Sequence, residues 1–221
     1  VLIPARGGSK GIPNKNMVEI NGKPLIFYTI TEALKVFKPS SVYVSSDSQA
    51  ILKYSESFGI QAILRPKNAS TDNSTSFDVI NHFLDTACID NSDFEIIYLQ
   101  PTSPLRRSNH ILEAIKIFKE KECDSLVSIC ESNEYPSKAF ILEGDFVRPF
   151  LDEEEYTEIR QNISPTFYPN GAIYIFNKEK FLKHGEIPRN KIAPYIMPKV
   201  DSIDIDDTID LEYAKMILKN E

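Results

Sequence analysis

Residues 1–16 read VLIPARGGSKGIPNKN, a short apolar segment that runs directly into a glycine-rich loop. The loop carries three cations, Arg6, Lys10 and Lys15, and the first carboxylate of the chain is Glu19. It also holds three glycines, Gly7, Gly8 and Gly11. Glycines let backbone N–H groups approach an anion closely, and lysine or arginine adds charge-assisted hydrogen bonds. The pattern indicates a polyphosphate-binding loop, although a solvated surface loop with chance lysines has a similar composition.

The order of the residues excludes the two common phosphate-binding loops. A P-loop requires G-x-x-x-x-G-K-[ST], and a dinucleotide fingerprint requires G-x-G-x-x-G. Here the order is R-G-G-S-K-G followed by P-N-K-N. We therefore expect a nucleotide-binding loop of another kind.

Strand-like and helical patterns alternate over the first 130 residues. The segments that predict strands are 1–4, 41–46, 61–64, 95–100 and 125–130, and those that predict helices are 24–37, 48–58, 75–88 and 108–122. This alternation is typical of an α/β fold of the Rossmann-like kind, with a mostly parallel sheet covered by helices on both faces. Ligands bind at the carboxyl ends of such strands, so the loops after Ile3, Val44, Leu64 and Leu99 are the candidates for a site.

The alternation breaks between residues 131 and 168. Short apolar runs, the turn at 143–145 and the acidic stretch 152–155 predict an inserted β-rich excursion, which could be a lid, a dimer arm or an ornament. The α/β pattern resumes with a strand at 171–176 and ends with a helix at 208–219, for which Asp206 or Asp207 is a candidate N-cap. We expect a single domain over residues 1–221.

Acidic and apolar residues alternate near the end of the chain, in DSIDIDD at 201–207. In an extended segment Ile203 and Ile205 would face the core, and Asp204 and Asp206 would share the other face. Two such carboxylates suit Mg²⁺, which binds a few carboxylates together with phosphate oxygens and water. The alternative is an ordinary strand end followed by helix-capping acids.

Three further loops carry polar residues that the fold class places near a site. The segment QPTSPLR at 100–106 follows the most apolar strand and suits recognition of a nucleobase or a sugar hydroxyl. Arg65-Pro66 and the segment YPNG at 168–171 are, taken alone, more typical of tight turns.

Composition narrows the class of protein. The formal net charge is −7, from 25 basic and 32 acidic residues, which argues against a general nucleic-acid or anionic-membrane surface. No apolar run is long enough to span a bilayer, and the first strand is too short for a signal peptide, so we expect a soluble cytoplasmic protein. The three cysteines, Cys88, Cys123 and Cys130, have no C-x-x-C spacing and suit reduced thiols rather than a disulfide framework or a zinc site.

Taken together and in order, five segments resemble the acylneuraminate cytidylyltransferase family, the CMP-sialic acid synthetases. They are residues 4–16, 64–66, 99–106, 169–174 and 201–206. The resemblance implies an enzyme that couples CTP to a nine-carbon 2-keto sugar acid such as sialic, legionaminic or pseudaminic acid, releases pyrophosphate, and works as a homodimer with Mg²⁺. The chain starts directly on its first strand, which leaves room for further residues before Val1.

The resemblance also assigns roles residue by residue. The residues that match nucleotide-binding positions are Ala5, Arg6, Gly7, Gly8, Ser9, Lys10, Lys15, Asn16, Arg65, Thr75 and Ser76. Those on the sugar side are Gln100, Thr102, Ser103, Lys138, Arg160 and Asn170, with Lys138 reaching in from the neighbouring chain on the excursion, which resembles the family's dimerisation arm. Asp204 and Asp206 match the metal ligands, and with Arg6 and Lys15 they form the implied catalytic set.

Two alternatives remain open. One is a cytidylyltransferase for the eight-carbon acid 3-deoxy-manno-octulosonate, or another sugar nucleotidyltransferase, although those relatives usually carry an R-x-x-S-T-R-x-P type of first loop. The other is a non-catalytic sensor of nucleotide sugars on the same fold, which would be expected to have lost Lys15, Asp204 or Asp206. Among the nine-carbon acids we lean towards sialic or legionaminic acid.

Overall fold

The computed structural model describes residues 1–9, 11–66, 69–71, 74–87, 93–151 and 156–219. Its centre is a seven-stranded sheet in the order β11-β7-β10-β6-β1-β4-β5. The strands are β1 (Leu2–Pro4), β4 (Tyr43–Ser46), β5 (Gln61–Leu64), β6 (Glu95–Tyr98), β7 (Ser125–Glu131), β10 (Phe167–Asn177) and β11 (Ile192–Ile196). All neighbouring pairs are parallel except those of β10, which runs antiparallel to β6 and to β7. The mostly parallel α/β sheet predicted from the sequence is confirmed.

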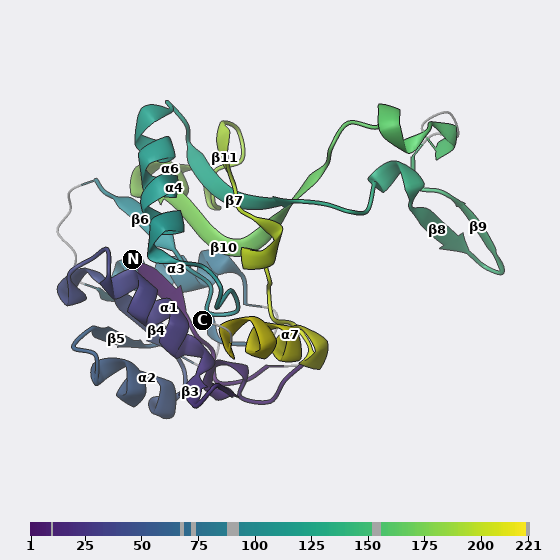
Figure 1. Cartoon of the computed structure of the whole chain (residues 1–221). Coiled ribbons are helices and arrows are strands. Elements are labelled where there is room, and N and C mark those ends of the chain that lie inside the picture. Colours follow the sequence, from purple (N-terminus) through teal and green to yellow (C-terminus); the bar gives the residue numbers. More distant parts are fainter. Residues whose placement is uncertain (10, 67–68, 72–73, 88–92, 152–155, 220–221) are drawn as a thin grey trace.

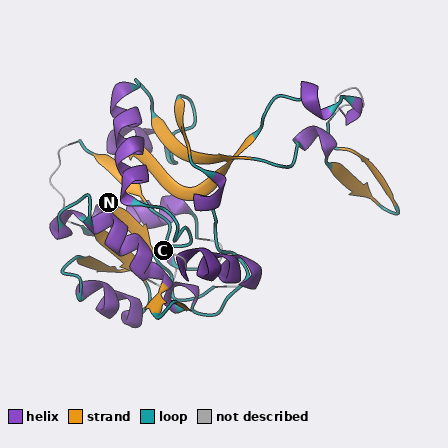
Figure 2. Ribbon diagram, in the orientation of Figure 1, coloured by secondary structure: helices purple, strands orange, loops and turns teal. Residues whose placement is uncertain are grey.

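Helices cover both faces of this sheet (Figure 2). On one face α1 (Leu25–Leu34), α2 (Gln49–Glu56) and α4 (Ser108–Glu120) contribute to one core cluster. On the other, α3 (Ser76–Thr86) and α6 (Lys178–His184) contribute to a second. Successive strand residues divide between the clusters, Leu2 in one and Ile3 in the other. Burial on both faces explains why the strands are almost continuously apolar.

A third cluster attaches the last helix to the first loop. Helix α7 (Thr208–Lys219) packs near a small hairpin formed by β2 (Glu19–Ile20) and β3 (Lys23–Pro24). The hairpin turns at Asn21 and Gly22, which both have positive φ angles (51° and 77°), as a two-residue Asn-Gly turn requires. The two ends of the chain are thereby packed together, so residues 201–207 lie beside the first loop.

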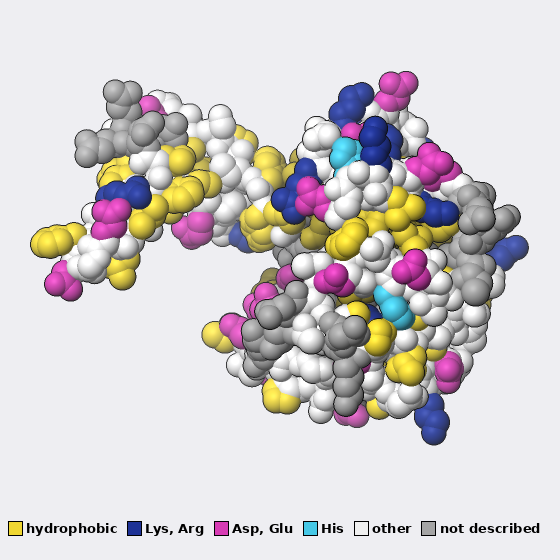
Figure 3. Space-filling model, turned by 180° about the vertical axis from the view of Figure 1, so that it is seen from behind, with side chains coloured by type: hydrophobic (Ala, Val, Ile, Leu, Met, Phe, Trp, Pro, Cys, Tyr) yellow, Lys and Arg dark blue, Asp and Glu magenta, His cyan; other side chains and the backbone are white. Residues whose placement is uncertain are grey.

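The segment between β7 and β10 leaves the body of the molecule and returns to it (Figure 1). It contains the hairpin β8 (Phe140–Glu143) and β9 (Phe146–Pro149) and two short 3-10 helices, Pro136–Lys138 and Arg160–Asn162. We call residues 132–166 the arm. Figure 3 shows, from behind, that apolar side chains gather on the surface of the arm. The exposed large apolar residues there include Phe140, Leu142, Phe146, Val147, Phe150 and Ile159, and such exposure is unusual for a monomer.

Most of the predicted elements have bounds that differ from the observed ones by one to four residues. Strand β5 and helix α7 have the predicted bounds, whereas α1 ends three residues early and β10 begins at Phe167, because Phe167–Pro169 pair with β7. The acidic stretch 152–155 and Cys88 lie outside the described residues, and Cys123 and Cys130 are free thiols. Within the described part of the chain, none of the helices combines the length and the apolar character that crossing a membrane requires.

Candidate active site

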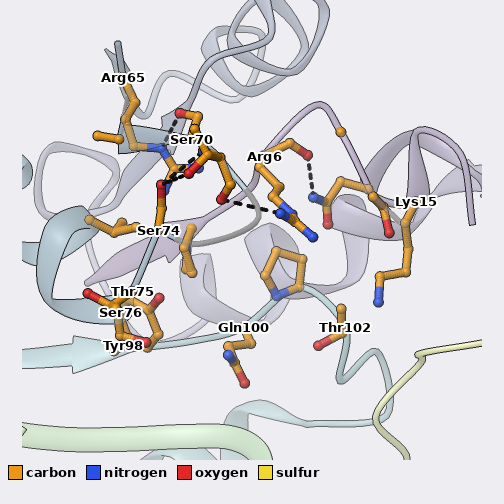
Figure 4. Close-up of a pocket in the computed structure, with 18 of the residues that line it drawn as sticks. Arg6, Lys15, Arg65, Ser70, Ser74, Thr75, Ser76, Tyr98, Gln100 and Thr102 are labelled. Carbon is orange, nitrogen blue, oxygen red and sulfur yellow. Dashed lines mark hydrogen bonds between the residues drawn. The ribbon is translucent and has the colours of Figure 1, made fainter. Parts of the chain in front are cut away.

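A pocket of about 340 Å³ opens at the carboxyl ends of β1, β5 and β6 (Figure 4). Within the sheet, β4 and β5 follow β1 in one direction, and β6 lies next to β1 in the other direction. Such a reversal of strand order is where α/β sheets bind their ligands. The lining is mainly polar: Pro4, Arg6, Gly8, Ser9, Lys15, Asn16, Arg65, Ala69, Ser70, Thr71, Ser74, Thr75, Ser76, Val79, Tyr98, Gln100, Pro101, Thr102, Asp204 and Asp206. We call it the nucleotide pocket, after the ligand that the sequence resemblance implies for the residues that line it.

The backbone of the first loop is held by the neighbouring strand β4 and the loop after it. The Ala5 N–H donates to the Ser45 carbonyl at 2.9 Å, and the Gly7 N–H donates to Asp47 Oδ1 at 2.7 Å. A Cβ on Gly7 would lie 2.9 Å from the Ser48 Cβ. Ala5 and Gly7 therefore shape the loop instead of lining the pocket, whereas Gly8 and Ser9 line it. Lys10 lies outside the described residues.

Two of the predicted basic side chains of the loop reach the pocket. Lys15 Nζ donates to the Ile205 carbonyl at 2.5 Å and to Asp206 Oδ1 at 3.2 Å. Arg6 Nη1 lies 3.5 Å from the Thr71 carbonyl, and Asn16 Nδ2 donates to the Arg6 carbonyl at 2.9 Å. Arg6 and Lys15 thus both project from the first loop into the pocket, where they can bind an anion together (Figure 4).

Arg65 is a buried cation at the end of β5. Its side chain is only 4% exposed, and Nε donates to Ser70 Oγ at 3.0 Å. Burial lowers the pKa of Arg65, and the nearby Tyr98 and Asp47 oppose that shift. Among the described residues Arg65 forms no ion pair within 4.0 Å. A buried charge is costly unless it is paired, so this guanidinium suits an anionic or strongly polar ligand in the pocket.

The first turn of α3 borders the same pocket. Thr75 is the N-cap: its Oγ1 accepts from the Asp78 N–H at 3.3 Å, and Asp78 Oδ2 accepts from the Thr75 N–H at 2.7 Å. This reciprocal capping box fixes the helix end. Ser76, the first residue of the helix, is left on the pocket wall with its hydroxyl near Tyr98 (Figure 4).

Asp204 and Asp206 line the pocket beside the first loop. Ile205 between them is fully buried, as the alternation predicts, although the segment pairs with no strand. Asp207, not Asp206, caps α7, because its Oδ1 accepts from the Ile209 and Asp210 N–H groups at 2.7 and 3.0 Å. Asp206 is thereby left with an 82% exposed side chain in the pocket mouth.

The environment of Asp204 suits a cation. Burial raises the pKa of its carboxyl, a hydrogen bond with Thr102 opposes the rise, and the charge of Asp206 adds to it. Its buried Oδ1 has no hydrogen-bond partner among the described residues. No group of three or more His, Cys, Asp or Glu side chains placed to hold a metal occurs in the described part of the chain. Two carboxylates with room for phosphate oxygens and water are the donor set that Mg²⁺ prefers.

The loop after β6 divides between the pocket and the interior. Gln100 and Thr102 line the pocket, and Gly171 on β10 makes room for Gln100, since a Cβ there would lie 2.7 Å from Gln100 Oε1. Arg106 points the other way: it is 1% exposed and donates to the carbonyls of Gln100 and Ala172 and to Thr29 Oγ1. Arg106 holds the loop in place and does not line the pocket.

Two predicted sugar-side residues are also part of the interior. Ser103 is fully buried with its Oγ 3.4 Å from the Asn170 carbonyl, and Asn170 is 1% exposed. The Asn170 amide accepts from Ser128 Oγ at 2.6 Å and donates to Ser202 Oγ at 2.9 Å. These bonds tie β7, β10 and the 198–202 segment together. The structure does not bring Ser103 or Asn170 to the pocket.

Lys138 and Arg160 lie on the arm, away from the pocket of their own chain (Figure 1). Lys138 Nζ donates to the Tyr156 and Glu158 carbonyls and lies 5.4 Å from the centre of the Tyr156 ring. The side chain of Arg160 lies outside the described residues. Lys138 is not among the described residues that line the nucleotide pocket of its own chain.

Sequence reasoning missed part of the lining. Ser70, Thr71, Ser74 and Tyr98 border the pocket, the first three from the loop between β5 and α3. The run of serine and threonine at 70–76 was an available signal, because it follows a strand end that the fold class assigns to the site. Tyr98 gave no such signal, since it sits in an apolar strand.

Comparisons with known proteins agree with this geometry. The family model described as cytidylyltransferase matches residues 1–219. N-acylneuraminate cytidylyltransferase of Streptococcus agalactiae is 39% identical over 209 residues, which are 93% of this chain and 49% of that protein. Pseudaminic acid cytidylyltransferase of Campylobacter jejuni is 31% identical over 99% of this chain and 95% of its own length. The chain thus spans about half the length of the streptococcal relative and nearly all of the other.

Solved structures share the fold at low sequence identity. The structure of CMP:2-keto-3-deoxy-manno-octonic acid synthetase complexed with CTP superposes with a TM-score of 0.71 at 17% identity, over 99% of this chain and 97% of that one. 4-Diphosphocytidyl-2C-methyl-D-erythritol synthase from Anaerococcus prevotii gives a TM-score of 0.65 at 13% identity, over 99% and 96%. These two likenesses establish the architecture alone. By its match over residues 1–219 and by the relatives above 30% identity, the chain belongs to the cytidylyltransferase family.

Proposed function

We propose that the protein couples CTP to a nine-carbon 2-keto sugar acid, giving the CMP-sugar and pyrophosphate. The observation that carries the proposal is a pocket in which Arg6, Lys15 and Arg65 meet two carboxylates, Asp204 and Asp206. Cations suit a triphosphate, and the carboxylates suit the metal ion that accompanies one. The named activities of the relatives, all cytidylyl transfer to nonulosonic acids, support the same reaction.

CTP would lie along the first loop. Arg6, Lys10 and Lys15 would neutralise the triphosphate, with the backbone at Gly8 and Ser9 beside it. Arg65, Asn16 and the first turn of α3 would receive the cytidine. Ala5 and Gly7 would act indirectly, because they fix the loop against β4 and Asp47.

Cytidylyltransferases of this kind generally use a divalent metal ion, and we assign Mg²⁺ to this protein. Asp204 and Asp206 would hold it, which fits the buried Oδ1 of Asp204 without a partner among the described residues. When bound, Mg²⁺ supplies neutralisation of charge on the phosphate oxygens. Lys15, in contact with Asp206 at 3.2 Å, sits where it can stabilise both that carboxylate and the leaving pyrophosphate.

This placement supports an in-line displacement. The anomeric hydroxyl of the sugar acid would attack the α-phosphorus of CTP and give up its proton to water or to one of the two aspartates, while the bond to the β-phosphate oxygen breaks and pyrophosphate leaves. Arg6 and Lys15 absorb the charge that grows on the leaving group. Gln100 orients the sugar but does not take the proton, because an amide is not a base at working pH.

The sugar acid would bind on the Gln100 side. A second cavity of about 710 Å³ adjoins the nucleotide pocket there and is lined by Phe77, Leu126, Val127, Tyr174, Pro188 and Arg189, among others. Its mixed apolar and polar wall suits an acylamino sugar more than a bare polyphosphate. Identity to the N-acylneuraminate enzymes is 37–39%, against 31–32% for the pseudaminic and legionaminic enzymes, so we place sialic acid first and legionaminic acid next.

We also propose a cytoplasmic homodimer in which the arm reaches the partner subunit. The exposed apolar side chains of the arm, with Phe146 at 80% and Leu142 at 74% exposure, would be covered in such a dimer (Figure 3). Lys138 and Arg160 would then meet the sugar carboxylate of the neighbouring site. Sedimentation at micromolar concentration tests this: we expect a dimer, and a monomer would contradict it.

The experiment that tests the reaction is pyrophosphate release from CTP and Mg²⁺ with a panel of sugar acids. The panel contains N-acetylneuraminic, legionaminic, pseudaminic and 3-deoxy-manno-octulosonic acids, with ATP, GTP and UTP as control nucleotides. We expect release with CTP and one nine-carbon acid. Release only with the eight-carbon acid would show that this acid, and not a nine-carbon acid, is the substrate. No release with any acid while CTP still binds would favour a non-catalytic sensor.

A further inference from the structure

Four residues form the wall between the nucleotide pocket and the second cavity: Thr75, Ser76, Tyr98 and Gln100. Tyr98 is the only one of the four that is buried, with 3% of its surface exposed. It is the last residue of β6 and pairs with Leu2 of β1 and with Tyr174 of β10. The backbone of Tyr98 is therefore fixed by the sheet, and its side chain lies at the boundary of two cavities that the proposed reaction fills with different substrates.

The position of Tyr98 otherwise calls for an apolar residue. Its neighbours along the chain are Ile96, Ile97 and Leu99, all buried, and its ring belongs to the same apolar cluster as Val79 and Phe83. A hydroxyl in such surroundings costs free energy unless it is hydrogen-bonded. A phenol at this point therefore needs a partner, and both candidates belong to the nucleotide pocket.

The neighbours that can serve are Ser76 and Arg65. Ser76 borders the same two cavities as Tyr98 (Figure 4), and both the Ser76 side chain and the Arg65 guanidinium lie close enough to the phenol to affect its ionisation. Burial raises the pKa of Tyr98 to about 12, so the phenol stays protonated at any working pH. On its other side the ring meets Tyr174 edge-on, with centroids 6.2 Å apart and planes at 71°.

We propose that Tyr98 is a positioning residue of the nucleotide pocket, which holds Ser76 and Arg65 in the geometry that receives CTP and separates the nucleotide from the sugar acid. The proposal rests on the proposed function. Arg65 Nε donates a hydrogen bond to Ser70 Oγ, and the Tyr98 phenol is a second polar neighbour of the guanidinium. Ser76 is the first residue of α3, so without this contact its hydroxyl would be free to rotate towards solvent.

Three variants test the proposal: Tyr98→Phe, Ser76→Ala and the double variant. The quantity measured is the dissociation constant of CTP, by calorimetry in the absence of sugar acid. We expect each single variant to weaken CTP binding about fivefold, the usual effect of one lost polar contact, and the double variant to lose less than the sum of the two single losses. KM for CTP should rise in parallel, while kcat at saturating CTP and KM for the sugar acid stay within about twofold of wild type.

Tyr43→Phe is the matched control. Tyr43 packs on Phe83 beside the same cluster, at 5.1 Å between ring centroids, and does not border the nucleotide pocket. It should leave CTP binding unchanged, and its effect on Tm measures the structural cost of losing a phenol hydroxyl in this part of the fold.

The possible outcomes separate this proposal from the proposed function. If Tyr98→Phe binds CTP within twofold of wild type while wild type releases pyrophosphate, Tyr98 has no positioning role and the reaction stands. Fully additive losses in the double variant would also overturn the coupling between Tyr98 and Ser76. A wild-type protein that neither binds CTP nor releases pyrophosphate would overturn both proposals.

Discussion

Replacing Gly171 with alanine should disable the site without unfolding the protein. Gly171 lies in the irregular part of β10 and has a φ of +73°, a conformation that other residues rarely adopt. A Cβ there would lie 2.7 Å from Gln100 Oε1 and 2.8 Å from Asp204 Oδ2. Glycine is therefore required at this position for two reasons: its backbone conformation, and the close approach of the Gln100 and Asp204 side chains.

The two requirements have different magnitudes and different readouts. Alanine in the left-handed region costs about 1–2 kcal/mol, which for a domain of this size lowers Tm by roughly 2–8 °C. Both contacts fall below 3.0 Å, so Gln100 and Asp204 must also shift to reach ordinary contact distance. A displacement of about 1 Å can cost about 100-fold in rate, and a smaller one proportionately less, so we expect kcat/KM to fall about 10- to 100-fold.

Gly59→Ala provides the matched control. Gly59 has the same φ of +73° and lies between α2 and β5, where an added Cβ would meet no side chain or distant backbone atom within 4 Å. Thermal unfolding should show a similar loss of Tm for both variants. Pyrophosphate release should be normal, per folded molecule, for Gly59→Ala and strongly reduced for Gly171→Ala. Equal turnover of the two variants would refute the claim that the reaction depends on where Gln100 and Asp204 are held.

Three further substitutions probe other parts of the account. Asp204→Asn should abolish turnover yet raise the free energy of unfolding of the metal-free protein at neutral pH. Burial raises the pKa of Asp204, so the folded state binds this proton more tightly than the unfolded state, and the stability of the wild type falls as pH rises through that pKa. Urea unfolding of the variant should therefore depend less on pH than that of the wild type, and an unchanged pH profile would contradict this prediction. Lys15→Met should weaken CTP binding by about tenfold or more in calorimetry, since a charge-assisted contact is lost. Unaltered affinity would show that Lys15 does not contact CTP. Arg106→Met should lower the free energy of unfolding by roughly 3 kcal/mol or more in urea titration, because three acceptors lose their donor, and a loss below about 1 kcal/mol would show that Arg106 does not hold the loop.

Much of the fold could be predicted because its signals are local. Helix α7 begins just after Asp207, whose side chain caps it, and β5 is a short run between turn residues, so both have the predicted bounds. Strand β11 was missed because it contains Pro194 and lies at the edge of the sheet, with Ile192 and Ile196 exposed. An edge strand tolerates a proline and needs no continuous apolar run, so its pattern is weak.

The site was predictable where charge carries the signal. The clustered cations of the first loop and the alternating aspartates have few alternatives, and the structure brings Arg6, Lys15, Asp204 and Asp206 to one pocket. Polar residues within a motif are harder to interpret, because they serve either a ligand or the backbone.

Arg106 and Asn170 illustrate the limit. Both belong to motif segments, yet both are buried, bind interior carbonyls and hydroxyls, and are not among the residues that line the nucleotide pocket. Tyr98 is the opposite case, a pocket residue concealed in an apolar strand. Only the packing of distant strands distinguishes these roles.

The measurement that tests the central claim most directly compares wild type with Asp206→Ala in Mg²⁺-dependent pyrophosphate release from CTP and the accepted sugar acid. The Asp206 side chain is 82% exposed, so the variant should fold normally, with Tm close to that of wild type. We predict at least a roughly 100-fold loss of turnover, because one of the two proposed metal ligands is gone. Near-normal turnover of Asp206→Ala at limiting Mg²⁺ would contradict the assignment of the two aspartates and, with it, the proposed mechanism.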